Sequence, residues 1–347
     1  MCRGLSVLLI AAASGLAFAG GARPHAAARP FIERLLLDNL SFSTAQLAAV
    51  RRGEPVTAAL PGTVDRELVL AGAIRIAAPV ERTVAIMRDI ERFESGVRFL
   101  ARQRLSDPPR AEDFARFTLT SGDVAALRRC RPGRCDVKLD VEAFPAVAAI
   151  DWAATDAAER ANVLLRSRAL AYVEGYQQRG AGAAFVYRDR ERPVLAAQEF
   201  ADMVTRSQPL GLLARELSAV LLQYPIARPP GDDEVFYWSV SDLGLKPVFR
   251  VHHVVVLQPE AASDLRQVMA TRLLYANHYF NSALDVRALI DDPSQPGDAH
   301  ILVTVSLARL DGISGLLGRV ARRRVREASR QALATTMVTT RDRAEAR

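Results

Sequence analysis

The C-terminal third of the chain contains five strand-like runs in succession, followed by one long segment with helical spacing. The runs lie between about 235 and 310 and read EVFYWSV, KPVFRVHHVVVLQ, RQVMATRLLYANHYF, SALDVRALI and HILVTVSLARL. They are rich in β-branched and aromatic residues, which favour extended backbone. The helical segment begins near Asp311 and places Ile313, Val325 and Leu333 on one apolar face. We therefore predict an α+β fold in which a long C-terminal helix lies across an antiparallel meander.

Length and composition indicate a folded globular protein. The chain has 347 residues, half of them hydrophobic and 24% charged. The formal net charge is +7, but only two of the 46 basic residues are lysines. We interpret this charge as an arginine-rich, solvated surface. The sequence contains no P-loop, no dinucleotide-binding glycine pattern and no nucleic-acid-binding module, so we expect no cofactor and no nucleic-acid partner.

The N-terminus has the form of a secretory signal peptide. Arg3 precedes an apolar run, and Ala17-Phe18-Ala19 has the small-x-small pattern of a cleavage site. We expect residues 1–19 to be removed and residues 20–30 to form a flexible N-terminus. No later stretch reaches the roughly 20 apolar residues that a spanning helix needs. The mature protein is therefore expected to be exported, periplasmic and soluble.

Cys130 and Cys135 enclose the turn-forming sequence Arg-Pro-Gly-Arg. Such a turn can bring two cysteines within disulfide range, and disulfides persist in oxidising compartments. A metal site would need further ligands nearby, and redox-active pairs commonly have the closer C-x-x-C spacing. We predict a structural disulfide between Cys130 and Cys135.

A second pattern lies at Ile74–Phe93. A strand ends in Ile-x-Ala-Pro and leads directly into an amphipathic helix that ends in Asp-Ile-Glu-x-Phe. This pattern resembles the opening of START-like domains of the Bet v 1-like (SRPBCC) superfamily, and the whole chain resembles a group of exported bacterial proteins. The superfamily resemblance implies a helix-grip fold, in which a curved antiparallel sheet wraps around a long C-terminal helix and encloses a hydrophobic cavity.

The segment between this opening and the meander is mostly helical in pattern. Helical spacing recurs from about 155 to 222, and a proline-rich break begins at Pro225. We predict one START-like domain over 31–347, with a helical insertion at about 138–230 that packs beside the sheet.

The two lysines, Lys138 and Lys246, are the first candidates for a binding site. In an arginine-rich chain, a lysine can mark a position that needs a compact ammonium group. The alternative is that each lysine forms a local structural ion pair or has no special role.

Polar-tipped residues on the meander are the second group of candidates. They are either packing residues of the sheet or lining residues of a ligand cavity. His252 and His253 are adjacent on a strand and should point to opposite faces, and no metal-ligand spacing occurs, so we expect no metal site. The candidates that we take as ligand-binding are Trp238, His253, Tyr275, Asn277 and Tyr279, together with the two lysines.

The leading hypothesis is a periplasmic protein that binds or transfers a hydrophobic or amphipathic small molecule, including a lipid. The first alternative is a cofactor-free enzyme that uses histidine or lysine acid–base chemistry in the same cavity. The second is an envelope structural or interaction protein with a filled core. We also consider contact between the arginine-rich C-terminal helix and anionic lipid, while the apolar face of the helix stays buried.

Overall fold

The computed structural model describes most of the chain after the first 28 residues. The predicted signal peptide lies outside the described residues, as does most of the predicted flexible N-terminus. For 92–93, 214–216 and 315–322 only the backbone is described. The described segments are 29–93, 99–228, 233–242, 246–259, 264–294, 297–311 and 315–346.

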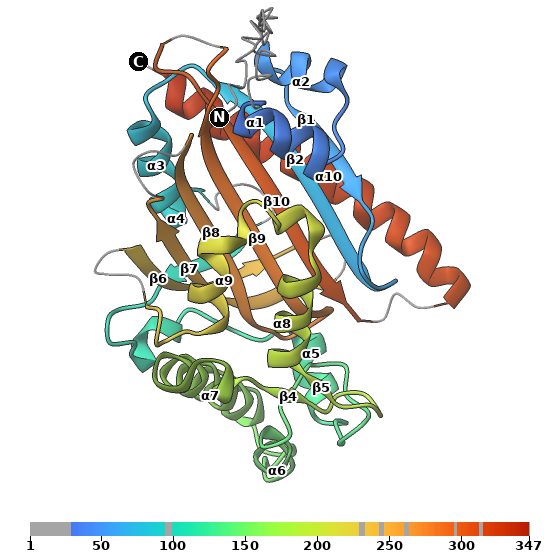
Figure 1. The fold of residues 1–347 in the computed structure, drawn as a ribbon. Coiled ribbons are helices and arrows are strands. Elements are labelled where there is room, and N and C mark those ends of the chain that lie inside the picture. The colour runs from blue at the N-terminus through green and yellow to red at the C-terminus, as the bar shows by residue number, and fades with distance from the viewer. Residues whose placement is uncertain are drawn as a thin grey trace, which may run out of the picture.

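An eight-stranded antiparallel sheet forms the centre of the molecule (Figure 1). The five C-terminal strands are neighbours in chain order, as the meander pattern predicts. Two further strands, β1 and β2, extend one edge, and β3 forms the other. In spatial order the strands are β1 (Val56–Leu60), β2 (Glu67–Ile76), β10 (His300–Leu310), β9 (Phe280–Asp291), β8 (Leu265–Ala276), β7 (Val248–Leu257), β6 (Glu234–Ser241) and β3 (Phe99–Arg104).

The helices that lie between β2 and β3 in the chain are α3 (Val80–Arg88) and α4 (Ile90–Phe93). The single amphipathic helix expected here is interrupted at Asp89, whose ψ of 74° is not helical. This connection carries the chain from β2 to β3, at the opposite edge of the sheet.

The sheet has two faces with different covers. One face meets the C-terminal helix α10 (Gly315–Glu345), and we call it the α10 face. The other meets the N-terminal and central helices, and we call it the insertion face. Figure 1 shows α8 and α9 in front of the strands and α10 behind them. Alternation along β10 separates the two, because Val303 and Val305 pack in the core of the insertion face while Leu302 packs with Met337 of α10.

Near β1, β2 and β8–β10 the insertion face is covered by short helices that bury a large apolar core. Ser43 and Gln46 form the capping box that their spacing predicts at the start of α2. These covering helices are α1 (Phe31–Glu33), η1 (Arg34–Asn39), α2 (Thr44–Arg51), α8 (Ala196–Arg206), η4 (Gln208–Leu210) and α9 (Ala214–Leu222).

A second core packs against β6 and β7, where Phe117 stacks on Phe249 beside Trp238. A central helical region builds this core, as the predicted fold class requires. The predicted disulfide between Cys130 and Cys135 is confirmed. The elements of this region are η2 (Ala111–Phe114), α5 (Ser121–Leu127), α6 (Ala143–Ala148), α7 (Ala157–Arg179), η3 (Gly180–Ala183) and the small hairpin β4 (Val186–Tyr187) and β5 (Val194–Leu195).

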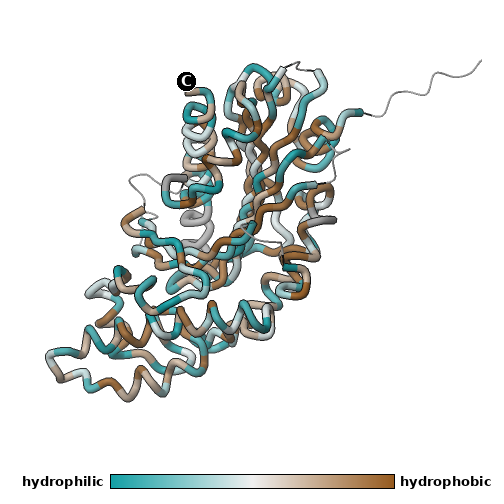
Figure 2. Tube along the Cα trace, turned by 90° about the vertical axis from the view of Figure 1, so that its left-hand side faces the viewer, coloured by the Kyte–Doolittle hydropathy of each residue, from teal (hydrophilic) through white to brown (hydrophobic). Residues whose placement is uncertain are grey.

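The 31-residue helix α10 confirms the predicted terminal helix. In Figure 2 it stands on one side of the strands, and brown, hydrophobic segments run along the strands. The long antiparallel sheet with a C-terminal helix laid across it is compatible with a helix-grip fold.

Candidate ligand-binding cleft

The α10 face carries polar side chains across the middle of the sheet. Strand register places Thr304 of β10 opposite Arg287 of β9, and Ser306 opposite Asp285. Asp285 is in turn opposite Thr271 of β8. Partners in register point to the same face, so these side chains form a continuous polar patch on the α10 face.

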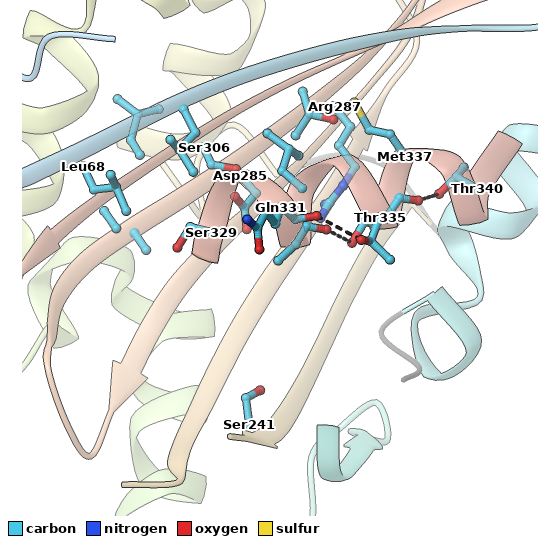
Figure 3. Close-up of a pocket in the computed structure, with 18 of the residues that line it drawn as sticks. Leu68, Ser241, Asp285, Arg287, Ser306, Ser329, Gln331, Thr335, Met337 and Thr340 are labelled. Carbon is cyan, nitrogen blue, oxygen red and sulfur yellow. Dashed lines mark hydrogen bonds between the residues drawn. The ribbon is translucent and has the colours of Figure 1, made fainter. Parts of the chain in front are cut away.

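A cleft with a volume of about 540 Å³ lies between this polar patch and the middle of α10. Figure 3 shows Asp285, Arg287 and Ser306 on the strands, with Gln331, Thr335 and Thr340 on the helix. The lining combines an apolar part with hydrogen-bonding groups. The apolar lining residues are Leu68, Leu70, Phe99, Phe280, Ala283, Leu302, Leu307, Ala308, Ala332, Leu333 and Met337. The polar lining residues are Ser241, Arg250, Asp285, Arg287, Thr304, Ser306, Ser329, Gln331, Thr335, Thr336 and Thr340.

The C-terminal part of α10 holds this helix against the sheet. The Glu345 carboxylate accepts a hydrogen bond of 2.6 Å from the backbone N–H of Ala77, and Arg341 donates to the Gly53 carbonyl at 2.8 Å. At Gly72 the helix comes so close that an added Cβ would lie 2.8 Å from the Met337 methyl group. These contacts fix the roof of the cleft relative to its floor.

The hydroxyl groups on α10 face the cleft mainly as acceptors. Thr335, Thr336 and Thr340 each donate a hydrogen bond to the carbonyl four residues earlier, at 2.8 to 3.0 Å. Their oxygen lone pairs stay available, so the helix offers acceptors to a bound molecule. Donors with a positive charge come from the sheet.

Three charged side chains line the cleft among the described residues: Arg250, Arg287 and Asp285. His252 lies on the same face, stacked on Tyr237 with ring centroids 4.5 Å apart. Burial, reinforced by Arg250 and Arg287, holds the pKa of His252 well below its usual value, so the imidazole is neutral at pH 7.

Lys138 lies on the other side of the sheet, where it is only 3% exposed. Its ammonium group donates to Asn281 Oδ1 at 2.7 Å and to Asp311 Oδ2 at 2.5 Å. Asp189 lies 3.7 Å away, and burial raises the pKa of its carboxyl group against the opposing effect of Lys138. Lys138 therefore joins the helical region to the end of β10.

Tyr275 and Asn277 lie beside Lys138, whereas Trp238 lies deeper in the same core. The Tyr275 hydroxyl donates to the Lys138 carbonyl at 2.9 Å, and burial raises the pKa of this tyrosine. The Asn277 side chain accepts from the backbone N–H of Phe249 at 2.8 Å. Trp238 donates to a backbone carbonyl of η2 at 2.7 Å.

His253 belongs to a separate buried cluster. Its Nε2 lies 2.8 Å from Glu234 Oε1, and its Nδ1 lies 3.2 Å from the Tyr176 hydroxyl. Burial lowers the pKa of His253, against the opposing effect of Glu234. The two adjacent histidines thus point to opposite faces, as strand alternation predicts.

Lys246 and Tyr279 meet at the end of the sheet, where the exposed Lys246 donates its backbone N–H to the Tyr279 hydroxyl at 3.1 Å. Strand alternation extended from Tyr275 through Asn277 to Tyr279 would place the three side chains on one face, but the strand does not continue that far. β8 ends at Ala276, and Tyr279 has a positive φ of 60° in the turn that follows.

None of the seven residues predicted from the sequence as ligand-binding lines the cleft. The structure brings Lys138, Tyr275 and Asn277 together and leaves the others apart; ligand contact by any of them stays a prediction. The cleft residues had a signal in the sequence, because alternate positions of β9 and β10 are polar. Asp285, Arg287, Thr304 and Ser306 alternate with apolar residues that pack on the insertion face.

The chain matches none of the protein-family models against which it was compared, and no curated protein is significantly similar to it. Among the described residues, no three histidine, cysteine or acidic side chains gather in a way that could hold a metal ion. No helix in the described part of the chain combines the length and the hydrophobicity needed to cross a membrane.

Proposed function

We propose that this protein binds a hydrophobic or amphipathic small molecule in the cleft between α10 and the sheet, and that it sequesters or transfers this molecule without catalysis. The observation that carries the proposal is the cleft of about 540 Å³ with its mixed lining. Small-molecule sites typically measure about 300–1,000 Å³ and combine an apolar body with a few polar groups. We also propose that the protein is a START-like protein, as the sequence resemblance implies, and that this cleft is its helix-grip cavity.

The proposed location is the periplasm. The disulfide between Cys130 and Cys135 is consistent with an oxidising, exported location. The signal-peptide pattern of residues 1–19 supports export independently of the disulfide.

The lining of the cleft favours binding over acid–base catalysis. Among the described residues that line it, Asp285 is the one carboxylate, and neither histidine nor lysine is present. A general acid and base would need two titratable groups within reach of one substrate. The open volume also favours a binding protein over a protein with a filled core.

The proposal is tested by recovering a bound molecule and by blocking the cleft. Protein purified from its own periplasm is examined by native mass spectrometry, followed by lipid extraction. In parallel, the neutral fluorescent probe N-phenyl-1-naphthylamine is titrated into the delipidated protein. We expect Ala308→Trp, which fills the cleft from β10, to weaken probe binding about ten-fold or more.

Val186→Trp is the matched control, because Val186 is an exposed apolar residue outside the cleft. This variant should bind the probe like the unmodified protein. If the native protein releases no bound molecule and the probe does not bind, the proposed function is overturned. Equal loss of probe binding in both variants would also contradict it.

A further inference from the structure

Arg250 has an unusual position in the wall of the cleft. It lies on β7, faces α10 and is partly buried. One of its Nη atoms donates to Ser241 Oγ at 2.7 Å, and its buried Nε has no hydrogen-bond partner. Among the described residues no carboxylate forms an ion pair with Arg250. In the part of the chain that the structure describes, Ser241 is the one hydrogen-bond acceptor of this guanidinium group, which carries five N–H donors.

Two other arginines that are partly or fully buried have carboxylate partners, whereas Arg272, which is 4% exposed, donates instead to the Tyr176 hydroxyl and the Leu221 carbonyl. Arg51 contacts Asp292 at 2.7 Å and Glu33 at 3.0 Å. Arg309, which is 2% exposed, contacts Glu67 at 3.0 Å and two further carboxylates. Moving a charge out of water is costly unless a counter-charge and hydrogen bonds compensate. An anion that enters the cleft could therefore form an ion pair and hydrogen bonds with Arg250.

The other charges of the cleft lie farther along the strands: Arg250 is opposite Ala276 of β8, Asp285 is opposite Thr271, and Arg287 lies two residues beyond Asp285. Arg287 lines the same cleft, and both arginines lower the pKa of His252, in addition to the larger effect of burial. Asp285 opposes them on β9, near the centre of the floor, where it would repel an anion. The favourable place for an anion is therefore at Arg250, toward β7.

We propose that the cleft takes an anionic single-chain amphiphile whose carboxylate or phosphate group is bound by Arg250 beside Ser241. Its chain would lie across the sheet toward Ala283 of β9 and Ala308 of β10, which line the cleft and which strand register places nearly level with Arg250. Two strands separate β7 from β10, a distance of about 14 Å, which one extended alkyl chain spans. This inference rests on the proposed function and narrows it to one ligand class.

The test compares ligands that share one chain and differ only in the headgroup. Dodecanoic acid, dodecyl phosphate and dodecanol are titrated calorimetrically into the delipidated full-length protein. We expect the two anions to bind about ten-fold or more tightly than the alcohol, because charge-assisted hydrogen bonds form only with them. Arg250→Gln should reduce this preference to less than about two-fold, because a neutral side chain no longer pairs with the anion. A circular dichroism spectrum like that of the unmodified protein shows that the variant is folded.

Asp285→Asn is the matched control, since it removes a charge from the same cleft without touching Arg250; it should keep or increase the preference for anions. Inorganic phosphate distinguishes a free anion from a lipid headgroup and should not compete with dodecyl phosphate at equal concentration. Equal binding of acid and alcohol, an unchanged preference in Arg250→Gln, or tight binding of phosphate alone would each overturn the inference. Failure of all three chain ligands to bind would instead overturn the proposed function.

Discussion

At the scale of single residues, the two lysines of the chain have opposite environments. Lys138 is buried and contacts Asp311 and Asn281, whereas Lys246 is exposed at the end of the sheet. The compact ammonium of Lys138 also lies 4.6 Å from the centre of the Tyr187 ring. A planar guanidinium would need more room and a different arrangement of acceptors.

Replacement of Lys138 by methionine should destabilise the protein strongly. It leaves the buried Asp189 and the neighbouring Asp311 without their shared cation. Breaking a buried ion pair on one side costs about 3 kcal/mol of the free energy of unfolding. Urea unfolding monitored by circular dichroism measures this loss.

Lys246→Met is the control for this experiment. Its side chain is exposed, so the free energy of unfolding should stay within about 0.5 kcal/mol of the original value. Equal midpoints for the two lysine variants would show that the Lys138 cluster contributes nothing specific to stability.

At the scale of elements, α10 divides into two parts with different surroundings. Its C-terminal part is held by Arg341, Glu345 and the close contact at Gly72. Toward its N-terminal part, Arg323, Arg324 and Arg326 are exposed. The helix can therefore stay packed on the sheet while these arginines remain free to meet an anionic surface.

We predict that these three arginines promote binding to vesicles of anionic lipid. Each basic residue near such a surface contributes about 1 kcal/mol, so changing all three to glutamine should weaken binding by roughly 100-fold. A sedimentation assay with phosphatidylglycerol vesicles at low salt measures the effect, and neutral phosphatidylcholine vesicles should bind neither protein.

A second triple variant controls for net charge. Arg116, Arg128 and Arg129 are exposed in the central helical region, away from α10. Their replacement by glutamine should have much less effect on vesicle binding. If both triple variants lose binding equally, the interaction reflects overall charge and not the surface of α10.

At the scale of the whole molecule, the sheet separates two differently packed regions, one on each of its faces. The insertion face is filled by two apolar cores, and the α10 face keeps an open cleft with a polar floor. Buried histidines occur on both faces. Burial lowers the pKa of His252, His253 and His300 below the usual value.

These histidines make stability depend on pH in a defined direction. In the unfolded chain these histidines bind protons with a pKa near 6.5, whereas in the folded state their pKa values are lower. Stability should therefore be complete above about pH 7 and fall as the pH decreases through about 6.5. Each histidine contributes a slope of at most about 1.4 kcal/mol per pH unit.

Urea unfolding at several pH values between 5.5 and 7.5 measures this dependence. The variant His252→Asn removes one titrating group. It should reduce the dependence of the free energy of unfolding on pH by up to about 1.4 kcal/mol per pH unit. A free energy of unfolding that is constant over this range would contradict the prediction.

Much of the fold could be predicted from the sequence. Runs rich in β-branched and aromatic residues predicted β6 to β10, the turn between Cys130 and Cys135 predicted the disulfide, and helical spacing predicted α10. These are local signals, because each depends on residues that are near one another in the chain.

The site depends on contacts that are remote in the sequence. The sequence showed that His252 and His253 point to opposite faces, but alternation alone does not say which face a helix covers. Only the tertiary structure decided that α10 covers the face of Arg250 and that the central helices cover the face of Lys138. On the face that α10 covers, polar residues form the floor of a cleft. On the face that the central helices cover, they form a buried ionic cluster around Lys138. The physical reason is that the covering helix decides whether a charged side chain meets solvent, an ion-pair partner or a ligand.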